Sequence, residues 1–258
     1  MDSAHDAQRQ GAAETLSSAA PAGLALVIGA GGGLGAALLA QLLSAAGAPG
    51  AAYPVVRALG RASQPAIDYD DEASLALAAD WVASQCAEIK LPLRLLLVAS
   101  GFLHGPQGQP ERSLSQLDAG YLSHAFAVNA IGPALVMKHF LPLLASQGRC
   151  VAGFLSARVG SIGDNALGGW YGYRASKAAL NQLVKTASIE LARRNRQAIC
   201  VALHPGTVAT SLSQPFAKTG LAVRSAQVAA AELLAVLAGL GAQDTGSFRD
   251  HKGQPVPW

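Results

Sequence analysis

Short apolar runs alternate with longer amphipathic stretches from residue 24 to the end of the chain. The short runs predict buried strands, and they comprise residues 24–28, 53–59, 66–68, 93–99, 150–155 and 198–203. The longer stretches repeat their apolar positions with a helical period, and they comprise residues 34–43, 71–87, 124–146, 176–193 and 223–240. Strands that alternate with helices are typical of βα units around a parallel sheet. The pattern therefore predicts an α/β fold, with a doubly wound, Rossmann-type, mostly parallel sheet flanked by helices.

No repeat or low-complexity linker divides this pattern, and 258 residues suit one compact domain. Hydrophobic residues make up 51% of the chain, which is ample material for a buried core. The preceding segment mixes alanine, serine, glutamine and acids without the basic start or apolar run of a secretory signal. We therefore expect a disordered tail at residues 1–22 and a single domain at residues 23–258.

Charge and composition narrow the range of partners. The net charge of +3 is small and no run of lysines and arginines could follow a phosphate backbone, which argues against nucleic acid. No apolar stretch approaches the roughly 18 uninterrupted residues of a membrane span. The cysteines lie far apart and the histidines lack ligand-like spacing, which favours a reducing, cytoplasmic location and no metal site.

A glycine-rich turn lies between the first predicted strand and the first predicted helix. It reads Gly29-Ala30-Gly31-Gly32-Gly33-Leu34-Gly35. The N–H groups and the dipole at the start of a helix favour an anion, and glycine lets the backbone approach a phosphate closely. We therefore predict a dinucleotide pyrophosphate site here, with a flexible, ligand-free turn as the alternative.

The residues after this turn bear on the choice of dinucleotide. A fold that prefers NAD offers an acid about 20 residues further on for the ribose hydroxyls. Residues 30–67 contain no Asp or Glu, whereas Arg57 and Arg61 lie at or just beyond the second predicted strand, where a 2′-phosphate would sit. This favours NADP(H) over NAD(H), and the alternative is that both arginines are solvated loop charges.

Tyr173 and Lys177 stand four residues apart at the start of a predicted helix, so they project from one face, one turn apart. A tyrosine titrates near pH 10 when unperturbed, and an adjacent ammonium stabilises its phenolate. We therefore expect a proton donor or acceptor whose pKa is brought closer to the working pH.

These residues resemble the motifs of the short-chain dehydrogenase/reductase family. The resemblance covers nearly the whole chain beyond the tail, and it is carried by Gly29-x-x-x-Gly33-Leu34-Gly35, Asp68, Asn129, Tyr173-x-x-x-Lys177 and Pro205-Gly206-Thr207-Val208-Ala209-Thr210. Residues 155–165 and 168–173 are most similar to the C-factor-like branch, which includes carbonyl reductases and proteins implicated in signalling. Each motif alone is unspecific, but together, in this order and spacing, they are specific.

The resemblance implies a role for each matching residue. It makes Tyr173 the acid/base, assigns Lys177 to that tyrosine and to the nicotinamide ribose, and gives Asn129 a water in a proton relay. Together with Arg61, the cofactor-binding set comprises Gly29, Gly31, Gly32, Gly33, Leu34, Gly35, Asp68, Ala99, Ser100, Gly101, Tyr173, Lys177, Pro205, Gly206, Val208 and Thr210. For Asn129 and Asp68 the alternatives are a packed helix amide and a loop acid.

The chain departs from the family pattern where a serine would hold the substrate carbonyl. That position, three residues before Gly160, is Ala157. Ser156 is adjacent and is our candidate catalytic serine, although it points to the opposite face unless a bulge re-aims it. Ser161 is the second candidate, and a strand-end hydroxyl without catalytic role is the alternative for Ser156.

Two further departures lie near the cofactor. Ile28 replaces the usual threonine-like residue before the glycine turn, and the asparagine-rich turn after the next strand of the pattern reads Val98-Ala99-Ser100-Gly101. Only the small Ser-Gly character remains beside the adenosine ribose.

Two functions remain open from the sequence. The first is an NADP(H)-dependent oxidoreductase that moves hydride between nicotinamide and a small carbonyl or alcohol substrate. The second is a non-catalytic dinucleotide-binding signalling or scaffold protein, for which Ala157 leaves room. The resemblance also implies a homodimer or homotetramer formed through the helices at residues 124–146 and 176–193.

Overall fold

Six parallel strands form the sheet of this protein, whose computed structural model describes residues 22–212 and 223–258. The strand order is β2-β1-β3-β4-β5-β6. The strands are β1 (Leu24–Ile28), β2 (Val55–Leu59), β3 (Leu93–Val98), β4 (Cys150–Leu155), β5 (Ala198–His204) and β6 (Phe248–Asp250). The predicted doubly wound α/β fold is thereby confirmed. The expected tail at residues 1–22 lies, except for its last residue, outside the described residues.

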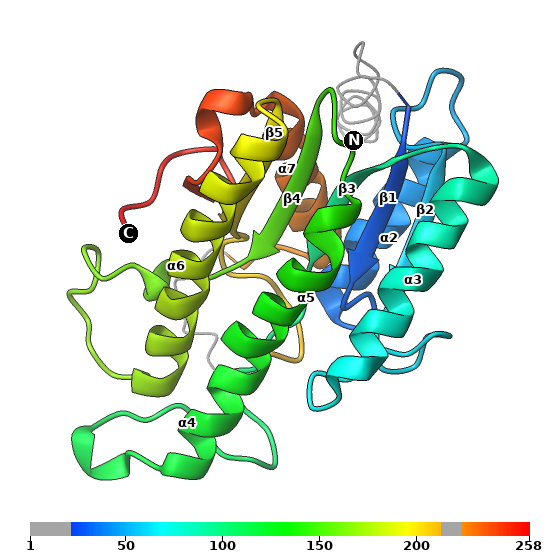
Figure 1. Ribbon diagram of the computed structural model, residues 1–258. Coiled ribbons are helices and arrows are strands. Elements are labelled where there is room, and N and C mark those ends of the chain that lie inside the picture. The colour runs from blue at the N-terminus through cyan, green and yellow to red at the C-terminus, as the bar shows by residue number, and fades with distance from the viewer. Residues whose placement is uncertain (1–21, 213–222) are drawn as a thin grey trace, which may run out of the picture.

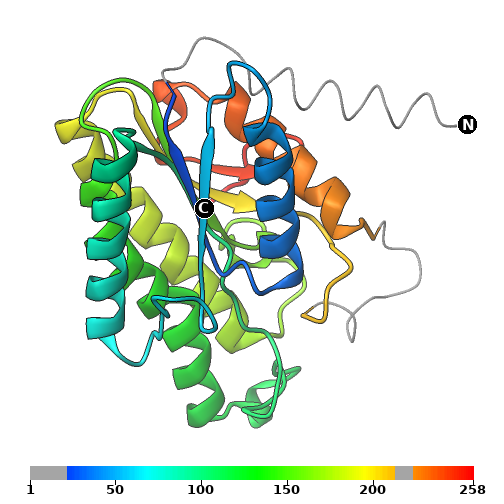
Figure 2. The same cartoon turned by 90° about the vertical axis from the view of Figure 1, so that its right-hand side faces the viewer.

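Helices cover both faces of the sheet (Figures 1 and 2). One face carries α2 (Gly33–Ala46) and α7 (Ala226–Gly239), which pack against each other. The other carries α3 (Glu72–Ile89), α5 (Gly132–Phe140) and α6 (Tyr171–Arg194), while α4 (Ala119–Phe126) extends below the sheet in Figure 1. The fold is therefore a three-layer sandwich with a separate large hydrophobic core on each face of the sheet.

Strand β1 shows why the central strands are continuous apolar runs. All five of its residues are buried. Leu24, Leu26 and Ile28 pack in the core beneath α3, α5 and α6, whereas Ala25 and Val27 pack in the core beneath α2 and α7. A parallel strand covered on both faces needs apolar side chains at every position, because alternate residues point to opposite faces.

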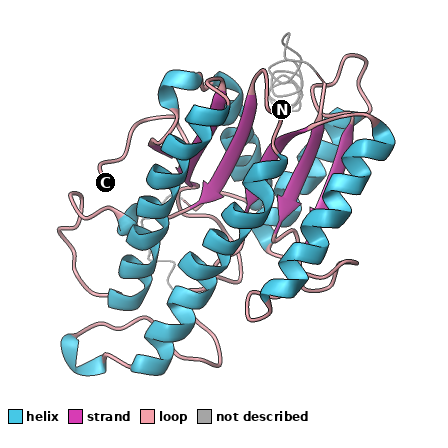
Figure 3. Ribbon diagram, in the orientation of Figure 1, coloured by secondary structure: helices cyan, strands magenta, loops and turns pink. Residues whose placement is uncertain are grey.

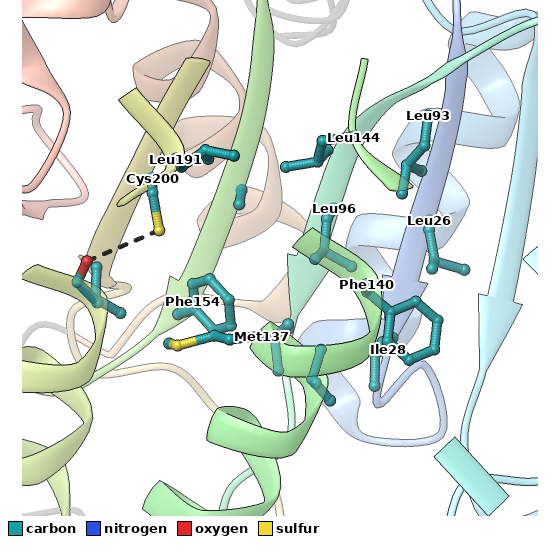
Figure 4. Close-up of a cluster of buried hydrophobic side chains, with 14 of the residues drawn as sticks. Leu26, Ile28, Leu93, Leu96, Met137, Phe140, Leu144, Phe154, Leu191 and Cys200 are labelled. Carbon is teal, nitrogen blue, oxygen red and sulfur yellow. Dashed lines mark hydrogen bonds between the residues drawn. The ribbon is translucent and has the colours of Figure 1, made fainter. Parts of the chain in front are cut away.

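Figure 4 shows part of the larger core, where Phe140 of α5 and Phe154 of β4 lie among strand leucines. Both rings are 0% exposed. The Cys200 thiol lies 3.9 Å from the Val184 carbonyl oxygen and ties β5 to α6 in the same layer. Truncating one such ring to alanine would cost about 3–5 kcal/mol of stability, since the cavity could not collapse fully.

One expected strand is not formed, and two helices begin at residues other than those expected. Residues 66–68 form no strand, because the Ile67 N–H is used by the Gly60 carbonyl in a turn and β3 already pairs with β1. The helix expected at 124–146 begins at Ala119 and is interrupted by a π-helical turn at Ala127–Ile131. The helix expected from residue 176 begins at Tyr171, so Tyr173 and Lys177 both lie within it.

The topology creates a switch point at the carboxyl edge of the sheet, the position at which open α/β sheets bind their ligands, hereafter the crevice. The carboxyl ends of the strands share that edge, as the arrowheads in Figure 3 show. Strand β1 has β2 on one side and β3 on the other, so the connections leave it in opposite directions. Ligands of open α/β sheets bind at such a switch point, and the turns after β1 and β3 meet there.

One helical stretch, Ala119–Leu143, is long and apolar enough to cross a membrane by length and composition. It comprises α4, the π-helical turn, α5 and the 3-10 turn Leu141–Leu143, and 44% of its most apolar window is buried inside the protein. It packs against α3 and α6. Length and composition alone are weak evidence for a membrane span.

Candidate active site

The glycine turn is shaped by two close backbone contacts. Gly29 has φ +86°, and a Cβ there would lie 2.7 Å from the Ser100 nitrogen after β3. A Cβ at Gly35 would collide with the Gly29 carbonyl oxygen. Glycine is therefore required at both positions, while Leu34 is buried in the core beneath α2 and α7.

The middle of the turn fits the phosphates of a dinucleotide. Gly32 caps α2 without any side-chain hydrogen bond, and the first turn of that helix contains no acid. A Cβ at Gly31 would meet nothing within 4 Å, and one at Gly33 would lie 3.0 Å from Thr210 Cγ2. Uncapped N–H groups, the helix dipole and open space together suit an anion.

Arg61 and Asp68 of the predicted cofactor-binding set lie beyond the end of β2. Arg61 is exposed, two residues after the end of β2. Arg57 is not available there, because its Nε donates to Gln85 Oε1 of α3 at 2.9 Å. Asp68 is exposed, and its Oδ1 accepts the Asp70 N–H at 3.0 Å within its own turn. Of the two arginines, Arg61 has an exposed side chain, whereas Arg57 is held against α3.

Tyr173 and Lys177 lie on the buried face of α6, 7% and 3% exposed. Lys177 Nζ is 6.0 Å from the centroid of the Tyr173 ring and donates to the Leu155 carbonyl oxygen at 2.9 Å. A Cβ at Gly101 would lie 3.7 Å from Nζ. The structure thus brings the tyrosine helix, the end of β4 and the turn after β3 together at the crevice.

Burial governs the ionisation of both groups. It raises the pKa of Tyr173 above its ordinary value, and it lowers the pKa of Lys177 to about 8. In this geometry Nζ donates to the Leu155 carbonyl oxygen and not to the phenol, so burial dominates the pKa of Tyr173. A tyrosine with a raised pKa stays protonated at neutral pH and so carries a proton to donate, although its pKa lies further from the working pH than that of an unperturbed tyrosine.

Asn129 lies at the π-helical turn and is 0% exposed. Its Oδ1 accepts the Phe102 N–H at 2.8 Å. Its amide donates to the Phe102 carbonyl at 2.8 Å and to Ser176 Oγ at 3.1 Å. The π-helical turn interrupts the regular helical hydrogen bonding at this residue, and the side chain joins three segments around the crevice.

The loop after β5 lies beside the glycine turn. Pro205 and Gly206 follow His204 directly, and Gly206 has φ +74°. Val208 is buried and forms a bridge with Arg224, while Thr210 lies over Gly33 of the glycine turn. Residues 205–210, which include part of the predicted cofactor-binding set, therefore lie beside the glycine turn. The residues that follow it, 213–222, lie outside the described part.

The family model described as short chain dehydrogenase matches residues 23–220, which is most of the chain. The chain belongs to the short-chain dehydrogenase family. The glycine turn and the Tyr173–Lys177 pair are among the motifs that carry the sequence resemblance to this family. This family consists of oxidoreductases, in agreement with the glycine turn at the start of α2.

Two curated short-chain dehydrogenase relatives are informative. C-signal of Myxococcus xanthus is 35% identical over 146 residues, which are 57% of this chain and 84% of that protein. The 1-hydroxy-2-glutathionyl-2-methyl-3-butene dehydrogenase of Rhodococcus sp. (strain AD45) is 33% identical over 145 residues, 56% of this chain and 62% of that protein. The chain therefore matches less than two thirds of the length of the second relative.

Solved structures of similar fold include carbonyl reductases. The NADPH-bound carbonyl reductase from chicken fatty liver has a TM-score of 0.79 at 23% identity, covering 96% of this chain and 98% of that one. A carbonyl reductase from Pseudomonas aeruginosa PAO1 has a TM-score of 0.66 at 26% identity, covering 92% and 100%. This likeness shows that the same fold extends over nearly the full length of each chain.

The short-chain dehydrogenase described here differs from the family pattern at Ala157, and the neighbouring hydroxyls are already used. Ser156 Oγ donates to Asn181 Oδ1 of α6 at 2.6 Å, and Asn181 Nδ2 lies 3.4 Å from the Gly160 carbonyl. Ser161 Oγ accepts the Asp164 N–H at 3.1 Å. Both serines are buried, and their hydrogen bonds hold the 156–164 segment in place.

Tyr69 is a site residue that the sequence did not reveal. Its hydroxyl and Ser100 Oγ are 2.6 Å apart, at the turn where the family pattern has asparagine. A Cβ at Gly132 would collide with the Tyr69 ring, so the ring packs on the backbone of α5. Burial raises the pKa of Tyr69 to about 12. The signal in the sequence was a glycine inside an apolar helix, which often marks a close approach.

Proposed function

We propose that this protein is an NADP(H)-dependent carbonyl reductase in which Tyr173 supplies the proton. The observation that carries the proposal is the buried Tyr173–Lys177 pair at the same sheet edge as the glycine turn. Ala99, Ser100 and Gly101 lie between the two, so a dinucleotide on the turn would extend toward the pair. The NADPH-bound carbonyl reductase of similar fold supports the same reading.

The chain's own residues would hold the cofactor from end to end. The N–H groups at the start of α2 would receive the pyrophosphate, Asp68 the adenine and Arg61 the 2′-phosphate. At the other end, the segment from Pro205 to Thr210 would hold the nicotinamide. When bound, the cofactor supplies or accepts a hydride. NADP(H) is favoured over NAD(H) because residues 30–67 contain a suitably placed arginine and no acid.

Tyr173 would donate its proton to the carbonyl oxygen during reduction. A buried, protonated phenol is the correct state for this step at neutral pH. The phenolate that it leaves would be stabilised by the Lys177 ammonium, which shares its desolvated surroundings. Asn129, at the helix interruption, would anchor a water through which the proton is replaced.

The missing family serine affects only one part of this scheme. With Ala157 in that position and the Ser156 hydroxyl bonded to Asn181, the carbonyl oxygen would be held chiefly by the Tyr173 phenol. Loss of one hydrogen-bond donor at a reacting oxygen costs about 10²–10³ in rate. We therefore expect a slow enzyme or one that prefers reactive, electron-poor carbonyls.

A panel of aldehydes, ketones and quinones tests the proposal through the loss of NADPH absorbance. We expect at least one class to be reduced, with electron-poor carbonyls reduced fastest. If nothing is reduced while NADPH binds, the second candidate function gains support. That candidate is a non-catalytic dinucleotide-binding signalling protein, and it is favoured by Ala157 and by the similarity to C-signal.

We further propose a cytoplasmic protein that self-associates and binds small carbonyl or alcohol substrates, with no nucleic-acid partner, membrane attachment or metal. Ile131 beside α5 and Ile189 of α6 are 53% and 50% exposed, which leaves apolar side chains on the surfaces expected to pair. Sedimentation at micromolar concentration should show a dimer or tetramer, and a monomer would contradict the assembly.

A further inference from the structure

Glu111 is a buried carboxylate in the connection between β3 and α4. Its side chain is only 2% exposed, although the residues that follow it are on the surface. Both of its oxygens accept the Gly172 N–H, Oε1 at 3.2 Å and Oε2 at 3.1 Å. Its own carbonyl oxygen accepts the Trp170 N–H at 2.5 Å. A buried charge is costly unless it is hydrogen-bonded, so these contacts require an explanation.

Helix α6 begins in an unusual way at the place where Glu111 contacts it. The residue before the helix, Trp170, has φ +53° and provides no side-chain cap. Gly168 and Gly169 before it also have positive φ, +64° and +63°. The N–H groups of the first turn therefore depend on a partner from elsewhere in the chain. Glu111 is the partner of one of them, the Gly172 N–H, and its negative charge also complements the positive end of the helix dipole.

The neighbours of Glu111 are fitted to this contact. A Cβ at Gly172 would lie 3.1 Å from Glu111 Oε1 and 2.9 Å from Tyr121 Cε1, so the carboxylate can approach only a glycine. From the opposite side, Arg174 donates to the carbonyl oxygens of Gly169 at 2.8 Å and Gly168 at 3.0 Å. The turn that leads into the helix is thus held by one carboxylate and one guanidinium.

We propose that Glu111 is a positioning residue that sets where the Tyr173 phenol lies in the crevice. Gly172, to which it bonds, is the residue next to Tyr173, and the Trp170 ring packs edge-on against the Tyr173 ring with centroids 6.2 Å apart. Glu111 itself touches no reacting atom. The inference rests on the proposed role of Tyr173 as proton donor. A displacement of about 1 Å in a catalytic group can cost about 10²-fold in rate.

The test compares Glu111→Ala, which removes the acceptor, with Glu111→Gln, which removes the charge but keeps an acceptor oxygen. Glu190→Gln, an exposed carboxylate on the same helix, is the control. We expect Glu111→Ala to lower kcat about 10²-fold with unchanged NADPH affinity, and Glu111→Gln to remain within about threefold of wild type. Amide exchange of peptides spanning residues 170–175 should accelerate in Glu111→Ala and not in the other two variants.

The two readouts separate the failure of this inference from that of the proposed function. Wild-type kcat in Glu111→Ala would overturn the inference, as would parallel losses of kcat and NADPH affinity, which indicate general damage. If wild-type protein reduces no carbonyl, the proposed function fails and the exchange measurement decides. Faster exchange confined to residues 170–175 then supports Glu111 as the determinant of the Tyr173 turn, and equal exchange overturns it. Should Glu111→Ala fail to fold, a Glu111→Gln variant that folds with protected amides supports the inference, and one with accelerated exchange overturns it.

Discussion

The glycine turn after β1 and the first turn of α6 lie at the same edge of the sheet, yet different groups hold them in shape. Around Gly29 and Gly35 the contacts are between backbone atoms, and no side chain forms the cap of α2. Around Tyr173 the geometry depends on side chains from distant segments, Glu111 and Asn129 among them. At Gly29 and Gly35 the first region tolerates no added atoms, whereas the second should tolerate changes of shape but not the loss of a hydrogen-bonding group.

Adding one methyl group should disrupt the glycine turn most strongly, because backbone contacts hold this turn in shape. Gly35→Ala places a Cβ against the Gly29 carbonyl, so we expect lost stability and no measurable NADPH binding. Gly31→Ala is the matched control for the fold, because nothing lies within 4 Å of its Cβ. It should melt like wild type and bind NADPH about tenfold more weakly if phosphates lie there. Calorimetry of both variants checks this, and unchanged affinity in Gly31→Ala would place the phosphates elsewhere.

Around Tyr173, where side chains hold the geometry, pH should change the rate of carbonyl reduction through Lys177. Burial lowers its pKa to about 8, so the ammonium is present below that pH and lost above it. Carbonyl reduction should therefore fall about tenfold per pH unit above pH 8, because the phenolate left on Tyr173 loses its counter-charge. A single-turnover pH profile measures this, and a rate that stays flat to pH 10 would rule out Lys177 as the titrating group.

The same group links pH to stability. The pKa of Lys177 in the fold lies below its ordinary value of 10.5, so between about pH 8 and 10.5 the unfolded chain binds the extra proton. The contribution of this residue to the free energy of unfolding should therefore increase with pH across that window. Denaturant titrations test this. In that window the free energy of unfolding of wild type should increase with pH relative to that of Lys177→Met, which lacks the titrating group.

Cofactor choice should depend on one exposed side chain. Arg61→Glu should weaken NADPH binding roughly tenfold or more and leave NADH unchanged, since a charge-assisted contact is worth about 1.5–3 kcal/mol. Arg57→Lys is the control, because Arg57 is held by Gln85 of α3. Equal losses of NADPH and NADH affinity in Arg61→Glu would show that this residue does not read the 2′-phosphate.

The smallest change in rate is expected at Ser156. Ser156→Ala leaves Asn181 Oδ1 buried without its donor, so stability should fall by about 1–3 kcal/mol while turnover changes less than about threefold. Thermal unfolding and steady-state rates of the purified variant test this. A rate loss of about 10²-fold at unchanged stability would instead support Ser156 as the group that holds the carbonyl.

Much of the fold was predictable from the sequence because it depends on local patterns. The buried strands are continuous apolar runs, and the glycine turn follows from chain geometry between β1 and α2. The early start of α6 at Tyr171 was not predictable, because its cap is Glu111, far away in sequence. The Tyr69–Ser100 pair and the turn of Ser156 toward Asn181 depend likewise on contacts between distant segments, for which local periodicity carries no signal.

The most direct test of the proposed chemistry is the single-turnover rate of Tyr173→Phe, measured beside its NADPH affinity. This substitution removes only the phenolic oxygen, which forms no hydrogen bond with another side chain in the described part of the protein. If Tyr173 donates the proton, reduction should slow by at least about 10²-fold while NADPH affinity stays the same. Reduction at the wild-type rate, under conditions where chemistry is rate-limiting, would contradict the assignment.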